Sequence, residues 1–311
     1  MRILVAERIA REGIERLAER HSVEERLGLD AGALRAMIEP YEALVVRSQV
    51  QVDASLLEAG RQLRVVGRAG TGLDNVDVAA AERLGIAVVN APGGNAVAAA
   101  ELTIGLLLAV ARHIPAADAS TRAGEWTRSR FAGVELRGRT LGIVGLGRIG
   151  LAVADRAAAF GMRLVGTDPY VSAEVAARHG VELVGLPDLL ASADVVTLHV
   201  PLDAGTTGLL DSVAIHALKP GAIVLNLARG GVVDEAVLAE ALRDGRVAGA
   251  GIDVYEREPP AGSPLLTAPN VVLTPHVAAS TAEAQVAVGI EIAERVLEVL
   301  DGLSAATSPG G

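Results

Sequence analysis

Three glycines near the middle of the chain, Gly145, Gly147 and Gly150, have the spacing G-x-G-x-x-G. In this pattern the first glycine permits a tight turn out of a strand, and the second lets the backbone approach a pyrophosphate. The third lets the following helix pack closely on the strand. The N–H groups at the start of that helix, helped by the helix dipole, then face the anion. The spacing therefore indicates a site for a dinucleotide.

The residues around the glycines complete the unit that such a site needs. Residues 141–144 are a short apolar strand candidate, and residues 162–167 form a second one that ends at Asp168. A carboxylate there accepts hydrogen bonds from an adenosine ribose and repels a 2′-phosphate. Arg163 precedes Asp168 within the strand, and no basic residue follows closely enough to hold a phosphate. The whole unit predicts dinucleotide binding and favours NAD over NADP.

A dinucleotide site implies hydride transfer, which needs a proton donor or acceptor and an anchor for the substrate. His276 ends one strand candidate of the second half, and the unperturbed pKa of imidazole lies near neutrality. A carboxylate partner would orient the ring, and either Glu258 or Glu256, after another strand end, could provide it. Arg229 follows a third strand and can bind a carboxylate through its planar fork. Spacing alone leaves the two glutamates as alternatives.

The other histidines are weaker candidates for proton transfer. His199 ends a strand and is followed by Val200, so we expect it to line the cofactor pocket rather than to donate a proton. The remaining four lie in or beside polar helical or loop stretches, which favours solvated or structural roles: His21, His113, His179 and His216.

Short apolar strand candidates alternate with helices along the chain, which predicts an α/β fold with parallel sheets and helices on both faces. Ligands then bind beyond the carboxyl ends of the strands. The expected strands are 2–6, 43–46, 63–66, 86–89, 141–144, 162–167, 181–184, 195–199, 222–227, 250–254 and 271–274, and the clearest helices are 11–20, 76–84, 96–111, 235–243 and 281–300.

The chain is expected to form two Rossmann or flavodoxin-like domains with a cleft between them. Residues 91–95, Ala-Pro-Gly-Gly-Asn, form the clearest break. The long helix at 281–300 has no strand after it and is expected to return to the first domain. This gives a discontinuous substrate-binding domain, residues 1–93 and 281–311, around an NAD-binding domain, residues 94–280. Residues 302–311 are expected to be disordered.

The composition excludes several classes of protein. The chain has 311 residues, enough for two domains, and a net charge of −10 that matches neither nucleic acid nor an anionic membrane. It has no cysteine, so disulfides, thiolate metal sites and cysteine nucleophiles are excluded, and we predict no metal site. The most apolar long segment, 96–111, contains Glu101 and is shorter than a membrane span. No signal peptide is recognisable, and a cytoplasmic location is expected.

Five longer motifs connect these features to one family. They are Val-Val-Gly-Arg-Ala-Gly-Thr-Gly-Leu-Asp-Asn-Val-Asp at 65–77, Gly-Leu-Gly-Arg-Ile-Gly at 145–150, Asn-Leu-Ala-Arg-Gly-Gly-Val-Val-Asp-Glu at 226–235, Gly-Ile-Asp-Val-Tyr at 251–255 and Thr-Pro-His-Val-Ala-Ala-Ser-Thr at 274–281. With them the chain resembles the D-isomer-specific 2-hydroxyacid dehydrogenases from about residue 44 to beyond residue 276. The resemblance implies Arg229, Glu258 and His276 as the catalytic trio, and so selects Glu258 over Glu256.

The resemblance also implies how the cofactor and a partner copy are bound. Family members bind NAD and are usually homodimers through the NAD-binding domain. Beyond the three glycines, the implied cofactor contacts are Thr71, Arg148, Ile149, Asp168, Val200, Leu227, Ala228, Asp253, Ala278 and Ala279.

Two arginines in the first half are the clue to the substrate. Arg47 and Arg68 follow strand candidates in a chain that is otherwise acidic. The resemblance suggests that they hold the phosphate of a phosphorylated hydroxy acid, while Arg229 and the backbone of Gly70, Thr71 and Gly72 hold its carboxylate. The implied reaction is the NAD-dependent oxidation of 3-phospho-D-glycerate to 3-phosphohydroxypyruvate, a step of serine biosynthesis.

Two other functions share parts of this pattern. An NADH-dependent reductase of glyoxylate, hydroxypyruvate or another 2-keto acid would have the same trio but would not need paired phosphate-binding arginines. A corepressor-like protein that senses NAD is the remote alternative. The chain ends where many family members carry a small regulatory domain, so we expect the short form, without feedback through such a domain.

Overall fold

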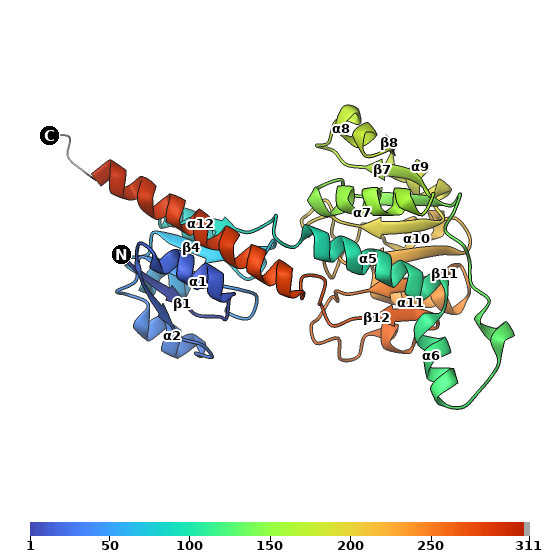
Figure 1. Ribbon diagram of the computed structural model, residues 1–311, viewed down its shortest axis with the longest axis horizontal. Helices are drawn as coiled ribbons and strands as arrows, with labels where there is room; N and C mark the ends of the chain where they lie inside the picture. Colours follow the sequence, from blue (N-terminus) through green and yellow to red (C-terminus); the bar gives the residue numbers. More distant parts are fainter. Residues whose placement is uncertain (308–311) are drawn as a thin grey trace. The chain divides into compact units, whose positions relative to one another are not determined.

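The computed structural model describes residues 1–307 and contains two compact units (Figure 1). The first unit consists of residues 1–95 together with the chain from residue 280 onward, and the second consists of residues 96–279. Within the described residues, each unit is built on one sheet in which every strand pair is parallel. Parallel pairing brings the carboxyl ends of all strands of a sheet to one edge, where ligands bind in such folds.

The first unit has a five-stranded sheet of order β2-β1-β3-β4-β5, the flavodoxin-like order. The strand order reverses between β1 and β3, which is where ligands bind in this fold. Its elements are β1 (Arg2–Val5), α1 (Arg11–Ala18), β2 (Ser22–Glu25), α2 (Ala31–Met37), β3 (Ala43–Val46), α3 (Ala54–Ala59), β4 (Val65–Arg68), α4 (Val78–Arg83), β5 (Ala87–Asn90) and α12 (Ala282–Thr307).

The last helix of the chain, α12, packs in this first unit against α1, β4 and β5 (Figure 1). Its buried apolar side chains, such as Val288, Ile292 and Val296, join those of β1 and β3 in one hydrophobic cluster. Gly13 in α1 lets the two helices approach closely, because a Cβ there would lie 2.4 Å from the carbonyl oxygen of Gly289. The returning helix is therefore part of the core of the first unit.

The second unit has a seven-stranded sheet of order β12-β11-β10-β9-β6-β7-β8, and its strand order reverses between β6 and β9. Its strands are β6 (Thr140–Val144), β7 (Arg163–Thr167), β8 (Val181–Leu183), β9 (Val195–Leu198), β10 (Ala222–Asn226), β11 (Val247–Ile252) and β12 (Val271–Leu273). Its helices are α5 (Ala96–Ala111), α6 (Ile114–Arg122), η1 (Arg128–Phe131), α7 (Arg148–Ala159), α8 (Ala173–Arg178), α9 (Leu186–Ser192), α10 (Ser212–Ala217), α11 (Glu235–Arg243) and η2 (Pro264–Thr267).

Helix α5 is the most apolar helix of the second unit and packs on β10, β11 and α7. Two glycines of β11 make room for it, since a Cβ at Gly249 would lie 2.5 Å from Val110 Cγ1 and one at Gly251 would lie 3.0 Å from Leu106 Cβ. In the described part of the chain no single helix is long and apolar enough to cross a membrane. Helices α5 and α6, which differ in direction by 60°, are together long and apolar enough for a span, by length and composition alone.

The α/β class with two parallel-sheet domains is confirmed, and the expected elements differ from the observed ones mainly at their ends. Strands β11 and β4 begin elsewhere than expected, at Val247 rather than 250 and at Val65 rather than 63. The polar strand β2 and helix α6 were not predicted, because neither carries a strong apolar pattern. Helix α12 continues to Thr307, so the expectation of disorder from residue 302 is wrong up to that point. The rest of that expectation, for residues 308–311, lies outside the described residues.

Candidate active site

The glycine turn after β6 has the shape that an anion site requires. Gly145 has φ +93°, and a Cβ there would lie 2.5 Å from the carbonyl oxygen of His199, the residue after β9. A Cβ at Gly150 would lie 2.0 Å from the carbonyl oxygen of Gly145, so the turn and α7 touch through backbone. At Gly147, by contrast, a Cβ would have no heavy atom of residues 1–307 within 4 Å apart from those of its own chain neighbours. Tight packing at two glycines and open space at the one between them fit a pyrophosphate at the start of α7.

Asp168 follows β7 at the same edge of the sheet and is partly exposed. Its Oδ2 accepts a hydrogen bond of 2.8 Å from the N–H of Leu146, inside the glycine turn. Its Oδ1 accepts from the N–H groups of Tyr170 at 2.8 Å and Val171 at 3.1 Å. The carboxylate therefore also joins the end of β7 to the glycine turn, a role that sequence reasoning missed because it depends on the pairing of β6 with β7.

His199 lies beside the glycine turn and is unsuited to proton transfer near neutral pH. Burial lowers its pKa to about 4, because a charged imidazole is poorly solvated there. Its Nε2 forms a 2.9 Å hydrogen bond with the Oγ1 of the buried Thr197. The lowered pKa agrees with the expectation that His199 is the weaker proton donor, and its place in a cofactor pocket stays a prediction.

This lowered pKa should make the protein less stable in acid. Between pH 6.5 and about 4 the unfolded chain binds a proton at His199 that the folded chain resists, so stability is complete above this window and falls as the pH falls through it. His199→Gln should remove about 2 kcal/mol of the stability difference between pH 7 and pH 5. Urea unfolding at both pH values measures this, with the exposed His216→Gln as control. An equal pH dependence in the wild type and in His199→Gln would contradict the assignment.

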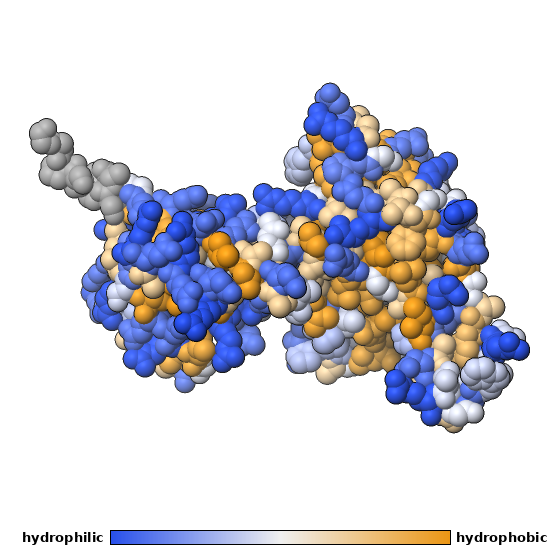
Figure 2. Space-filling model, in the orientation of Figure 1, coloured by the Kyte–Doolittle hydropathy of each residue, from blue (hydrophilic) through white to orange (hydrophobic). Residues whose placement is uncertain are grey.

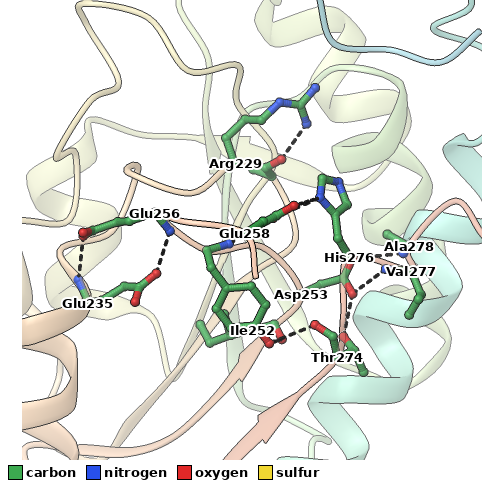
Figure 3. Close-up of polar contacts among 12 residues, drawn as sticks. Arg229, Glu235, Ile252, Asp253, Glu256, Glu258, Thr274, His276, Val277 and Ala278 are labelled. Atoms are coloured by element: carbon green, nitrogen blue, oxygen red, sulfur yellow. Dashed lines mark hydrogen bonds and ion pairs between the residues drawn. The ribbon is translucent and has the colours of Figure 1, made fainter. Parts of the chain in front are cut away.

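Arg229, Glu258 and His276 come from the loops after β10, β11 and β12, which are adjacent strands of one sheet (Figure 3). The Nδ1 of His276 lies 2.8 Å from Oε2 and 3.0 Å from Oε1 of Glu258, so both carboxylate oxygens contact that nitrogen. Both side chains are partly open to solvent, at 48% and 40%. The arrangement leaves Nε2 of the ring to exchange a proton with a substrate. The guanidinium of Arg229 donates from Nη1 to the carbonyl oxygen of Ala228 at 2.7 Å.

The structure distinguishes the two glutamates that spacing left open. The Oε1 of Glu256 accepts from the N–H of Glu235 at the start of α11, at 3.3 Å (Figure 3). Glu258 instead contacts His276 and also accepts from the N–H of Tyr255 at 3.2 Å. Glu258 is therefore the partner of the imidazole in this structure.

Asn226, the last residue of β10, was not predicted as part of the site. Its side chain is buried and bonded to the loop that carries Arg229. The Nδ2 donates to the carbonyl oxygen of Arg229 at 3.0 Å, and the Oδ1 accepts from the N–H of Ala228 at 3.1 Å. A polar residue that ends an otherwise apolar strand was the available sign of this role.

Asp253 supports the loop that carries His276 and is fully buried. Its Oδ1 accepts from Thr274 Oγ1 at 2.6 Å and from the N–H of Val277 at 2.8 Å, and its Oδ2 accepts from the N–H of Ala278 at 2.9 Å. Its carbonyl oxygen accepts from the N–H of His276 at 2.9 Å. These bonds hold His276 in a left-handed conformation, φ 53°, that non-glycine residues rarely adopt. The cofactor contacts expected of Asp253, Ala278 and Ala279 stay predictions.

Tyr255 joins the two loops on which the His276–Glu258 pair depends. Its backbone N–H donates to Glu258, and its buried hydroxyl donates to the carbonyl oxygen of Thr274 at 2.9 Å. Burial, followed by the nearby carboxylates of Asp253, Glu235 and Glu258, raises the pKa of Tyr255 to about 12. The hydroxyl thus stays a hydrogen-bond donor at every ordinary pH.

Arg47 lies at the point of the first unit where the strand order reverses, directly after β3. The carboxylate of Glu7, which follows β1, accepts from the N–H groups of Arg47 at 2.7 Å, Gln49 at 3.0 Å and Val50 at 3.1 Å. The Nδ2 of Asn75 donates to the carbonyl oxygen of Arg47 at 2.8 Å. A cavity of about 390 Å³ lies at this place, lined by Ala6, Glu7, Arg8, Leu27, Gly28, Arg47, Ser48 and Gln49.

Arg68 ends β4, the neighbour of β3, and therefore lies at the same edge of the sheet as Arg47. Its guanidinium folds over Gly70, where a Cβ would lie 1.9 Å from Arg68 Nη1 and where φ is +146°. Thr71, between Gly70 and Gly72, donates from Oγ1 to Asn95 at 3.0 Å and accepts at its carbonyl oxygen from Asn90 at 2.6 Å. The loop at 70–72 is thus held by the last residue of β5 and by the turn before α5.

Comparison with known proteins identifies the family of the chain. Residues 104–278 match the family described as D-isomer specific 2-hydroxyacid dehydrogenase, NAD binding domain. The chain is 50% identical over 305 residues to D-3-phosphoglycerate dehydrogenase of Archaeoglobus fulgidus, in an alignment that covers 97% of this chain and 58% of that protein. The chain thus spans little more than half the length of this curated relative.

Two solved structures extend the likeness to nearly the whole chain. The first is a crystal structure of a protein from Thermus thermophilus, which shares 39% sequence identity with this chain and superposes on it with a TM-score of 0.88. The match covers 97% of each of the two chains. The apo-structure of D-lactate dehydrogenase from Escherichia coli is 29% identical, with a TM-score of 0.83 and coverage of 97% of this chain and 98% of that one. The family resemblance read from the sequence motifs is confirmed, and the chain belongs to the D-isomer specific 2-hydroxyacid dehydrogenase family.

Proposed function

We propose that the protein is an NAD-dependent dehydrogenase that oxidises 3-phospho-D-glycerate to 3-phosphohydroxypyruvate, a step in serine biosynthesis. The observation that carries the dehydrogenase activity is the His276–Glu258 pair, which adjoins the loop of Arg229 at the strand ends of the NAD-binding domain. The phosphorylated substrate is supported by Arg47 and Arg68 and by the name of the relative from Archaeoglobus fulgidus.

Each member of the trio has one task in the proposed reaction. Bound NAD supplies the acceptor for the hydride that leaves C2 of the substrate. His276 takes the hydroxyl proton at Nε2 as the C=O bond forms, and Glu258, at Nδ1, stabilises the resulting imidazolium. Arg229, with the backbone of residues 70–72, holds the substrate carboxylate and aligns C2.

We assign most of the cofactor contacts to the second unit and the substrate phosphate to the first. Gly145, Gly147 and Gly150 would receive the pyrophosphate, and Asp168 the adenosine ribose. The further cofactor contacts are proposed at the positions that the family resemblance implies: Thr71, Arg148, Ile149, Val200, Leu227, Ala228, Asp253, Ala278 and Ala279. The dinucleotide-binding domain then corresponds to residues 94–280, and the substrate-binding domain to 1–93 and 281–311.

The decisive measurement compares three substrates in the reductive direction. With NADH, kcat/KM for 3-phosphohydroxypyruvate should exceed that for hydroxypyruvate and for glyoxylate by at least about 100-fold, because only the first offers a phosphate to the arginines. Equal or better turnover of the unphosphorylated acids would instead favour a 2-keto acid reductase, the alternative to which the likeness to a D-lactate dehydrogenase points.

Removing one arginine tests whether it recognises the phosphate. Arg68→Ala should raise KM for 3-phosphohydroxypyruvate by about tenfold to 100-fold, the usual loss for one charge-assisted contact, and change KM for glyoxylate less than about twofold. Steady-state kinetics on both substrates measure the difference. Arg61→Ala, which removes an exposed arginine of the same unit, serves as control and should change neither value. An equal loss for both substrates would show that Arg68 does not recognise phosphate.

The protein is further proposed to be a cytoplasmic homodimer formed through the second unit, without a nucleic-acid or membrane partner. On the face shown in Figure 2, apolar residues gather on the second unit more than on the first. Large apolar side chains that are exposed there include Val97 on α5, Ile114 on α6 and Trp126 before η1, at 57%, 52% and 79%. A second copy would cover such residues. Analytical ultracentrifugation measures the mass.

A further inference from the structure

Glu258 is held in a segment without regular secondary structure. The chain from residue 253 to η2 contains neither helix nor strand, yet it must keep the carboxylate within 3 Å of His276 Nδ1. A loop of this kind keeps one conformation only if bonds from more rigid elements fix it. A residue outside the loop must therefore supply them.

A buried carboxylate on α11 binds both halves of this loop. Glu235, the first residue of α11, is 8% exposed. Its Oε1 accepts from the N–H of Glu256 at 2.7 Å, and its Oε2 accepts from the hydroxyl of Ser263 (Figure 3 shows the first of these bonds). The N–H of Glu235 donates in return to Glu256 Oε1 at 3.3 Å. The attachments lie before and after Glu258 in the chain.

Glu235 is itself on a firmly placed element. Asp234 caps α11 by accepting from the N–H groups of Ala236 and Val237, each at 3.0 Å. The inner face of the helix is buried in the core of the second unit through Leu238 and Leu242. A side chain at the start of such a helix can act as a fixed reference point for a loop.

We propose that Glu235 is a positioning residue for the reaction: its carboxylate clamps residues 256–263 and thereby keeps Glu258 against His276. This inference rests on the proposed function, in which Glu258 stabilises the imidazolium. Without the clamp, the loop gains alternative conformations, and a displacement of about 1 Å at a catalytic group is enough to cost about 100-fold in rate.

The contacts of Glu235 predict which substitution keeps the clamp. In Glu235→Gln the amide oxygen can accept from the N–H of Glu256, and the amide NH₂ can donate to Ser263 Oγ, so both attachments persist. In Glu235→Ala both are lost. Glu240→Ala removes an exposed glutamate from the same helix and is the matched control.

A double-mutant cycle separates positioning from a general structural role. Glu235→Ala should lower kcat by about tenfold or more with KM for NADH little changed, whereas Glu235→Gln and Glu240→Ala should stay within about twofold of the wild type. In a Glu258→Gln background, Glu235→Ala should lower kcat by less than about twofold, because the residue through which it acts is already disabled. The same loss in both backgrounds, or no rescue by Gln in a folded protein, would overturn the proposal.

Hydrogen exchange tests the clamp without reference to turnover. The amides of residues 255–258 and 261–263 should exchange at least about tenfold faster in Glu235→Ala than in Glu240→Ala and keep their wild-type rate in Glu235→Gln. If Glu235→Ala does not fold, Ser263→Ala, which removes one attachment, should still speed this exchange. Unchanged exchange would refute the clamp. Absence of turnover on every 2-hydroxy acid, with the exchange pattern as expected, would refute the proposed function alone.

Discussion

His276→Asn should lower kcat by about 1000-fold or more in both directions of the proposed reaction, since a positioned acid or base contributes about 100-fold to 10,000-fold. Asparagine is the suitable replacement because it tolerates the left-handed backbone, φ 53°, that His276 adopts, and because its amide neither takes up nor releases a proton near neutral pH. The loss should appear in kcat, since the imidazole acts on the reacting hydroxyl and binds no other part of the substrate in this mechanism.

Three measurements make this expectation specific. NADH affinity, followed by fluorescence, should stay within about twofold of the wild type, because the dinucleotide contacts lie mainly on other loops. Glu258→Gln should lower kcat less, by about 100-fold, because the base remains and only its carboxylate partner is lost. Thermal unfolding checks that both variants are folded. A His276→Asn protein that retains more than about a tenth of wild-type kcat would show that another group moves the proton.

Gly150→Ala should prevent NADH binding and lower the free energy of unfolding by about 3 kcal/mol or more. A Cβ at this position would lie 2.0 Å from the carbonyl oxygen of Gly145. The atoms that clash are backbone on both sides, in the turn and in α7, so the strain can be relieved only by moving the helix away from β6. That movement would spoil the arrangement of N–H groups at the start of α7.

Gly147→Ala is the matched comparison, because the same methyl group at this position meets no heavy atom of residues 1–307 within 4 Å beyond its own chain neighbours. Its free energy of unfolding should change by less than about 1 kcal/mol. Its affinity for NADH should still fall by about tenfold or more, since the methyl group occupies the space into which a pyrophosphate would come. Urea unfolding and NADH titration of both variants measure the two effects. Equal loss of stability in both would mean that the glycine at 147 serves the fold and leaves the cofactor site unaffected.

The sequence predicts the fold class and the places of most strands well, because both depend on local patterns. The glycine turn, the strand before it and Asp168 are contiguous in the chain, and their types alone restrict what they can form. Strand β11 shows where this fails. Its glycines at 249 and 251 weaken the apolar pattern, and they are needed because α5 lies against them. A requirement set by a helix more than 130 residues away in the chain cannot be read from the strand itself.

The supports of the site are harder to predict than its exposed residues. By their local pattern, Asn226 looks like the end of a strand and Glu235 like the start of a helix. Their hydrogen bonds to the loops that carry Arg229 and Glu258 follow from the tertiary structure. Spacing alone could not choose between Glu256 and Glu258, because the two lie two residues apart in one irregular loop, and the choice came from the family resemblance. Side chains that bind ligands have characteristic types, whereas side chains that bind loops do not.

The trio and its supports, Asn226, Asp253, Glu235 and Tyr255, all belong to the second unit, whereas Arg47 and Arg68 belong to the first. Under the proposed function, the machinery of proton transfer and the selection of substrate are encoded by separate stretches of the chain. Evolution can then alter the loops after β3 and β4 to admit a new 2-hydroxy acid without disturbing the His276–Glu258 pair. An engineer who seeks a different substrate should therefore randomise residues 47–50 and 68 and leave residues 70–72 and the seven-stranded unit untouched.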